Sequence, residues 1–355
     1  MTKNLSYLSY PLPPDIQRLF EAGDFDRMAR VIRQRLEDPR VPKTLHERLR
    51  FQLIIAKEIP EYYRLTQADM LAILQENIND FTEDELETLR DDGTLDWRYI
   101  NGEVHFRNNC LDALLKVRKE YALRAKDPEV QAAADARGQR LNAMITRMKE
   151  EGGMHVRFEL HEEMTVKSDR LTPGETLRIH LPLPVVGAQV KSAALLSTSH
   201  PAAFIAPADE PQRTVYFELP YEPGMTVSAE LAYEIEAPYC QPHAREVLAE
   251  QPTFDTEEMP PHVVFTPYLR ALAKEIVGDE TNPLLKARKI YDFITTQAVY
   301  RYMPPYLTVT NLPEYFMSGL RGDCGVQAIT FVTLCRLCGV PAQWQSGLYT
   351  KPNSA

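Results

Sequence analysis

Apolar residues recur at helical spacing through most of the first 150 positions. Leu71, Leu74 and Ile78, for example, lie three and four residues apart and therefore share one face of a helix. Several such stretches follow one another up to a pair of glycines at 152–153, a signal that ends helices. The spacing predicts a mainly helical domain over residues 1–153.

Two local signals subdivide this domain. Thr82 is followed three residues later by Glu85, a capping-box pattern that marks the start of a helix. Farther on, hydrophobic and polar residues alternate on both sides of Asn101-Gly102, a dipeptide typical of two-residue hairpin turns. The alternation predicts a β-hairpin near 97–106.

The segment 154–240 changes to a period of two, which is typical of half-buried strands. Pro-Gly pairs at 173–174 and 223–224 separate the alternating runs and mark turns. Short strands divided by turn signals predict a β-sandwich-like domain. The runs with the clearest alternation are 156–160, 177–181, 215–219 and 227–235.

A stretch rich in proline and glutamate, 241–262, has neither period and is predicted to be a linker. Helical spacing returns over 263–355, where Asn282-Pro283 combines a capping residue with a proline suited to the first helical turn. A very apolar helix is predicted at 324–338.

The pattern as a whole predicts an α+β protein. Its parts are a helical N-terminal domain, a β-sandwich-like middle domain and a C-terminal part that mixes helices with short extended stretches. Within this last part, prolines at 304, 305 and 313 predict a loop ahead of the apolar helix.

Composition and charge narrow the class of protein. The chain is 44% hydrophobic and 25% charged, which excludes a disordered or fibrous protein. A net charge of −10 argues against a nucleic-acid partner. The acidity is concentrated in residues 151–260, where 7 basic and 18 acidic side chains give a net charge of −11. We expect this excess to form a solvated face of the sheet.

The cellular location is predicted from three signals that the sequence lacks: a membrane span, a signal peptide and a disulfide framework. No apolar run approaches the ~18–20 residues needed to cross a bilayer, so no membrane association is predicted. The N-terminus has no basic region followed by an apolar stretch, and five cysteines do not form a disulfide framework. These features predict a cytoplasmic protein.

The strongest candidate for chemistry is Cys324, at the junction of a glycine-containing loop and the apolar helix. A helix N-terminus offers unpaired N–H groups and positive potential, which favour a thiolate and could also stabilise an oxyanion. Asp323 is placed to cap the helix, and Gly322 and Gly325 let backbone or substrate approach closely. This arrangement suits a thiol nucleophile.

The other cysteines of this segment fit a different role. A cysteine on a helix is often a small buried hydrophobe, and Cys335 and Cys338 fit that role because they lie among apolar neighbours. A zinc site with Cys324 would have three thiols and no histidine after them, whereas structural zinc takes four ligands. No metal is predicted, and without a glycine-rich phosphate loop no cofactor is predicted either.

The segment 282–347 resembles the first half of a transglutaminase-like core, a papain-like superfamily with Cys-His-Asp catalytic residues. As in that family, an amphipathic helix precedes Gly-Asp-Cys, and the Cys opens a buried helix that ends in Gly-Val-Pro-Ala. The β-rich segment 154–240 resembles an extra domain of many bacterial members. The matching stretches are Pro283–Ile294, Val299–Tyr302, Gly322–Gly325 and Leu334–Ala342.

The resemblance implies that Cys324 is the nucleophile and that a histidine base and an aspartate follow it on downstream strands. The sequence after Cys324 contains no His, Asp or Glu, and all eight histidines precede it. We therefore expect 263–355 to be the N-terminal part of a truncated core. The chain is then either a fragment of a longer enzyme or a natural truncated relative.

The predicted function is thiol-dependent acyl transfer or hydrolysis on peptide or carboxamide substrates. The resemblance does not separate a protease from an amidase or a transamidase, and we expect little turnover from the 355-residue chain. The alternative is a non-catalytic module that binds a protein or peptide through a degenerate core. A protein or peptide partner is expected in either case, and the oligomeric state stays open.

Overall fold

The computed structural model describes residues 6–167, 171–187, 189–345 and 347. The chain has a mixed α+β fold, as predicted, and divides into two compact units. The first unit combines the residues up to Arg137 with His243–Trp344, and the second contains Gly138–Pro242. Two segments far apart in the sequence thus build one unit, while the domain boundaries expected from the sequence stay a prediction.

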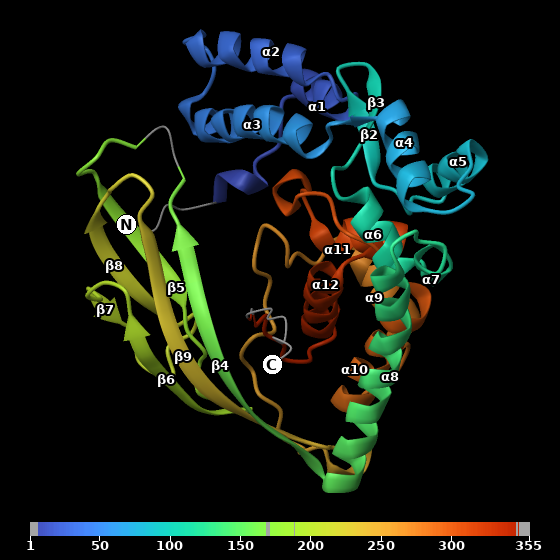
Figure 1. The fold of residues 1–355 in the computed structure, drawn as a ribbon, viewed down its shortest axis with the longest axis vertical. Helices are drawn as coiled ribbons and strands as arrows, with labels where there is room; N and C mark the ends of the chain where they lie inside the picture. Colours follow the sequence, from blue (N-terminus) through green and yellow to red (C-terminus); the bar gives the residue numbers. More distant parts are fainter. Residues whose placement is uncertain (1–5, 168–170, 188, 346, 348–355) are drawn as a thin grey trace. The chain divides into compact units, whose positions relative to one another are not determined.

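The N-terminal segment of the first unit is mainly helical (Figure 1). Its only sheet among the described residues has three short strands in the order β1-β3-β2. The 3₁₀-helix η1 comes first. The elements are η1 Ser6–Ser9, α1 Pro14–Glu21, α2 Phe25–Glu37, α3 Lys43–Tyr62, β1 Leu65–Thr66, α4 Gln67–Asn77, α5 Glu83–Asp91, β2 Trp97–Ile100, β3 Glu103–Phe106, α6 Cys110–Val117 and α7 Lys119–Ala122. The next helix, α8 Pro128–Glu151, begins in this unit and continues into the second.

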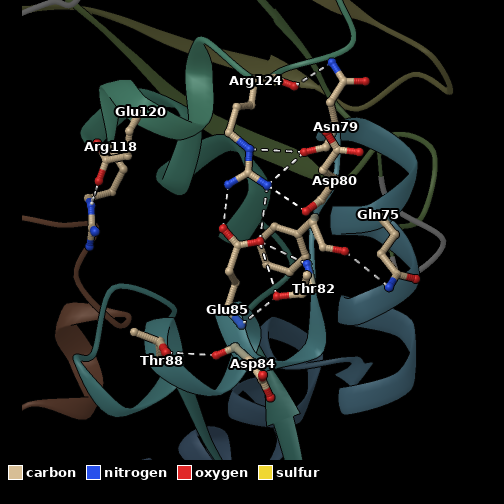
Figure 2. A network of polar contacts seen from close by, with 11 residues as sticks. Gln75, Asn79, Asp80, Thr82, Asp84, Glu85, Thr88, Arg118, Glu120 and Arg124 are labelled. Atoms are coloured by element: carbon tan, nitrogen blue, oxygen red, sulfur yellow. Dashed lines mark hydrogen bonds and ion pairs between the residues drawn. The ribbon is translucent and has the colours of Figure 1, made fainter.

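The capping box at the start of α5 is confirmed. The Thr82 amide donates to the Glu85 carboxylate at 3.0 Å, and the Glu85 amide donates to the Thr82 hydroxyl at 3.3 Å. Figure 2 shows that Arg124 binds the same carboxylate, 2.5 Å from Nη1 to Oε1, and also donates to the backbone oxygens of Asn79 and Asp80. The cap therefore ties α5 to the chain that follows α7.

The hairpin between β2 and β3 is also confirmed. Asn101 and Gly102 have φ values of 50° and 101°, the positive pair that a type I′ turn requires. The turn fixes an antiparallel register in which Trp97 lies opposite Phe106. Phe106 is fully buried among the side chains of α4, α5 and α6, so the hairpin belongs to the core of this segment.

The C-terminal segment packs four helices around one apolar core. Two short strands, β10 and β11, pair in parallel just before the last helix. The predicted cap at Asn282 is confirmed, since its side chain accepts from the amides of Leu284 and Leu285. The elements are α9 Pro267–Val277, α10 Pro283–Gln297, β10 Val299–Tyr300, η3 Tyr306–Thr308, α11 Leu312–Gly319, β11 Arg321–Gly322 and α12 Cys324–Leu337, and the predicted linker holds only the 3₁₀ turn η2 Ala244–Glu246.

One element of this segment differs from the sequence prediction. The prolines predicted a continuous loop up to the apolar helix, but Leu312–Gly319 forms α11. Asn311 caps α11 by accepting from the Glu314 amide at 2.9 Å, and Pro313 lies in its first turn. A proline there costs nothing, because the amides of the first turn have no partner within the helix.

The second unit is built from two three-stranded sheets in the orders β4-β9-β6 and β5-β8-β7. The long strands β4 and β9 lie side by side over their full length (Figure 1). The two sheets share one apolar core, which confirms the predicted sandwich. The strands are β4 Gly153–Thr165, β5 Thr176–Pro182, β6 Val190–Thr198, β7 Phe204–Ile205, β8 Thr214–Pro220 and β9 Thr226–Pro238.

The four alternating runs predict β4, β5, β8 and β9 correctly, whereas β6 and β7 were missed. β6 pairs antiparallel with β9, and the pairing has two register irregularities. The side chains of β6 therefore do not keep a strict period of two. β7 is only two residues long, too short to show any period. Both strands are recognisable only from their pairing.

Candidate active site

Cys324 is the first residue of α12, and its side chain is exposed. The preceding residue, Asp323, caps the helix as predicted: its Oδ1 accepts from the Val326 amide at 3.0 Å. The other amides of the first turn have no acceptor within the helix and point toward its N-terminal end. The thiol therefore lies at the positive end of the helix dipole, next to potential oxyanion donors.

A tyrosine that the sequence did not single out holds the cap in place. The Tyr306 hydroxyl donates to Oδ1 of Asp323 at 2.5 Å. Burial raises the pKa of Tyr306, and its bond to Asp323 raises that pKa further, so the hydroxyl remains a donor. A Cβ on Gly325 would overlap the Tyr306 hydroxyl, so this glycine permits the contact. The only available signal was an aromatic residue 17 positions upstream of Asp323.

The loop before Cys324 is fixed by strand pairing. Tyr300 of β10 lies opposite Gly322 of β11, and the Gly322 carbonyl accepts from the Arg301 amide at 3.2 Å and from the Gln327 side chain at 3.0 Å. Gly322 is buried, and a Cβ there would overlap Val326. Its role in the structure is therefore close packing of the loop against α12.

Aromatic side chains and one lysine lie near Cys324. Burial is the main cause that raises the pKa of Tyr300, with a further increase from Cys324 and a decrease from Lys116. The Lys116 ammonium lies 5.5 Å from the centre of the Tyr300 ring and 4.8 Å from that of Tyr302. Lys116 belongs to α6, so the N-terminal segment contributes to the surroundings of the candidate nucleophile.

The two later cysteines belong to the core. Cys335 is buried in α12, and burial raises its pKa to about 12. Cys338 is half-buried just after α12, and burial raises its pKa as well. Both remain protonated thiols near neutral pH, which agrees with a packing role. Among the residues whose placement is described, no group of His, Cys, Asp and Glu could hold a metal ion.

The histidines are spread over both units. None of the hydrogen bonds or ion pairs found in the described part of the chain joins a histidine to Cys324 or Asp323. His262 lines a small cavity together with Tyr306, and burial lowers its pKa. Within the described residues, the geometry thus brings together an exposed thiol, the carboxylate that caps its helix and a tyrosine, without a bonded imidazole.

The part of the chain that contains Cys324 matches a known protein family. Residues 270–354 match the model of the transglutaminase-like superfamily. This part of the chain is a transglutaminase-like domain. The match begins within α9 and includes Cys324 and the whole of α12. The match agrees with the resemblance seen in the sequence.

The other comparisons are more distant. A crystal structure from Cytophaga hutchinsonii, named as a "Putative Cysteine Protease", is 16% identical. The likeness covers 53% of this chain and 67% of that one, with a TM-score of 0.35. No curated protein matches the sequence. Within the described residues, no helix is both long and apolar enough to cross a membrane.

Proposed function

We propose that Cys324 is the nucleophile of a thiol-dependent acyl transfer or hydrolysis on peptide or carboxamide substrates. The observation that supports this most is an exposed cysteine on the first residue of a capped helix, inside the transglutaminase-like domain. The helix N-terminus supplies amides for the oxyanion of a tetrahedral intermediate.

The proposed reaction has two steps. The thiolate attacks the carbonyl carbon of the substrate, the C–N bond breaks, and a thioester forms while ammonia or an amine leaves with one added proton. Water or a second amine then attacks the thioester and releases the thiol. Hydrolysis gives a carboxylic acid, whereas an amine acceptor gives a new amide. The peptide or protein partner is in this scheme the acyl donor.

The test compares Cys324→Ala with the unmodified protein. Ammonia release from an N-protected glutaminyl-glycine dipeptide and cleavage of an unstructured protein such as casein would measure amidase and protease activity. We expect low turnover by the unmodified chain and loss of that turnover in Cys324→Ala, since removal of a covalent nucleophile leaves only residual catalysis. Cys240→Ala is the matched control, because it removes the second exposed thiol and should leave activity unchanged.

Thiol labelling supplies an independent measurement. Iodoacetamide should alkylate Cys324 faster than Cys240 at pH 7, although both are exposed, because only Cys324 lies at a helix N-terminus. Full activity in Cys324→Ala would contradict the proposal. If instead no substrate is turned over and Cys324 reacts no faster than Cys240, the alternative of a non-catalytic binding module is favoured.

A further inference from the structure

A cavity of about 890 Å³ opens in the first unit, between residues of the N-terminal segment and the loop that follows β10. Neither Cys324 nor Asp323 lines it. Its volume lies in the range of ligand-binding pockets, roughly 300–1,000 Å³. The aromatic residues in its lining are Phe20, Tyr63, Trp97, Tyr99, Tyr268 and Tyr315.

Three of the tyrosines in this lining have hydroxyl groups that are already hydrogen-bonded within the protein. The Tyr63 hydroxyl donates to Asp96 at 2.8 Å, and the Tyr268 hydroxyl donates to the Met317 carbonyl at 3.0 Å. The Tyr315 hydroxyl accepts from Arg301 at 3.1 Å. Guanidinium groups of the protein already lie over the rings of Phe20, Tyr63 and Trp97. Among the described residues none lies over Tyr99, Tyr268 or Tyr315, so these three rings are the π surfaces that a cationic ligand meets.

Two of the three carboxylates of the lining point to the same class of ligand, whereas the third, Asp96, is paired with Arg301. Glu21 ends α1 and Glu314 lies in the first turn of α11. In the part of the chain that the structure describes, neither carboxylate takes part in an ion pair, and Glu21 accepts a single hydrogen bond from Gln17. Their charge is therefore not neutralised by the protein.

The cation of the lining, Arg98, is already engaged. Its guanidinium lies 5.0 Å from the centre of the Phe25 ring and 5.4 Å from that of Phe20, and it donates to the Phe20 carbonyl. Burial also lowers the pKa of Arg98. An anionic ligand would therefore have limited access to this guanidinium. The charge available to a ligand is consequently negative.

We propose that this cavity binds a peptide segment through a lysine or arginine side chain. The cationic head lies between Glu21 and Glu314, and its aliphatic stem lies against the aromatic rings. This site is separate from the nucleophile, so the inference does not depend on the proposed activity.

The test uses Trp97 as a reporter. The chain has two tryptophans, and Trp344→Phe leaves Trp97, which lines the cavity, as the sole tryptophan, whose emission is excited selectively at about 295 nm. The probe is the tripeptide N-acetyl-Gly-Lys-Gly-amide, with the norleucine and glutamate analogues as matched comparisons. We expect a saturable change in Trp97 fluorescence with the lysine peptide and at least about tenfold weaker binding of the norleucine peptide. Titration calorimetry on the unmodified protein measures the same affinities without the reporter.

Charge-neutralising variants locate the binding. Glu21→Gln and Glu314→Gln should each weaken lysine-peptide binding about threefold, and both together about tenfold. Glu76→Gln is the control, because it removes an exposed carboxylate of α4 that does not line the cavity, and it should change nothing. The proposal is wrong if neither method detects binding up to about 10 mM. Equal binding of the norleucine peptide, tighter binding of the glutamate peptide or an equal effect of Glu76→Gln would also overturn it.

Discussion

At the scale of single residues, the bond from Tyr306 to Asp323 is the contact that most directly supports the candidate nucleophile. Tyr306→Phe removes the hydroxyl and keeps the ring. We expect the free energy of unfolding of the first unit to fall by about 1 kcal/mol, since the lost bond is made to a charged group. Without this donor, the Asp323 carboxylate repels a neighbouring thiolate more strongly, so alkylation of Cys324 should slow by about threefold.

Denaturant unfolding followed by tryptophan fluorescence and iodoacetamide labelling measure these two effects. Both tryptophans lie in the first unit, so their fluorescence reports on its unfolding. Tyr291→Phe is the control, because Tyr291 is 54% exposed on α10. Unchanged stability and unchanged labelling in Tyr306→Phe would show that the hydroxyl does not support the site.

At the scale of elements, the features that the sequence predicts best are those that depend on residues close together in the chain, such as helix caps. The caps at Thr82, Asn282 and Asp323 each bond an amide two or three residues away, so the signal and its partner lie within one helical turn. Cys324 was recognisable for the same reason. In α11, by contrast, Pro313 signals a loop as readily as a first turn, and the choice depends on packing of the helix against α9 and α12.

Two substitutions of Asp323 separate its charge from its cap. Asp323→Asn keeps an oxygen that can accept from Val326, whereas Asp323→Ala does not. We expect the asparagine variant to retain its stability and the alanine variant to lose about 1–2 kcal/mol of unfolding free energy. The alanine variant should also alkylate Cys324 more slowly than the asparagine variant, because the first turn of α12 frays and the thiol loses the helix N-terminus.

The control for this pair is Thr82→Ala, which removes the cap of α5. It should lower the stability of the first unit by a similar amount and leave the labelling rate of Cys324 unchanged. If Cys324 is alkylated equally fast in Asp323→Ala and Asp323→Asn, the cap does not affect the reactivity of the thiol.

At the scale of the whole molecule, the sequence did not reveal that the N-terminal segment and the transglutaminase-like domain share one compact unit. The contacts that join them link residues about 200 positions apart, beyond any local signal. Arg301 donates to the Gly93 carbonyl at 2.6 Å, and Arg107 donates to the Met303 carbonyl. These contacts adjoin β10, so the packing that fixes the loop before Cys324 depends partly on the N-terminal segment.

Arg301 and Asp96 form the most buried ion pair between these segments, with side chains 15% and 13% exposed and an N–O distance of 3.7 Å. Burial raises the pKa of Asp96, and Arg301 is the strongest influence that opposes this rise. In Arg301→Met the pKa of Asp96 should therefore rise further. The folded state would then hold a proton that the unfolded state, with an Asp pKa near ~3.9, releases.

Because that folded state binds more protons than the unfolded state, its stability must fall as the pH rises above about 4, until the folded pKa is passed. We expect Arg301→Met to cost about 2–4 kcal/mol of unfolding free energy at pH 8 and clearly less at pH 5. Adding Asp96→Asn should remove this pH dependence. Arg288→Met breaks the exposed pair with Asp292 and should change stability by less than about 0.5 kcal/mol at either pH. An equal loss at both pH values in Arg301→Met would mean that packing of the arginine stem, and not the buried charge, joins the two segments.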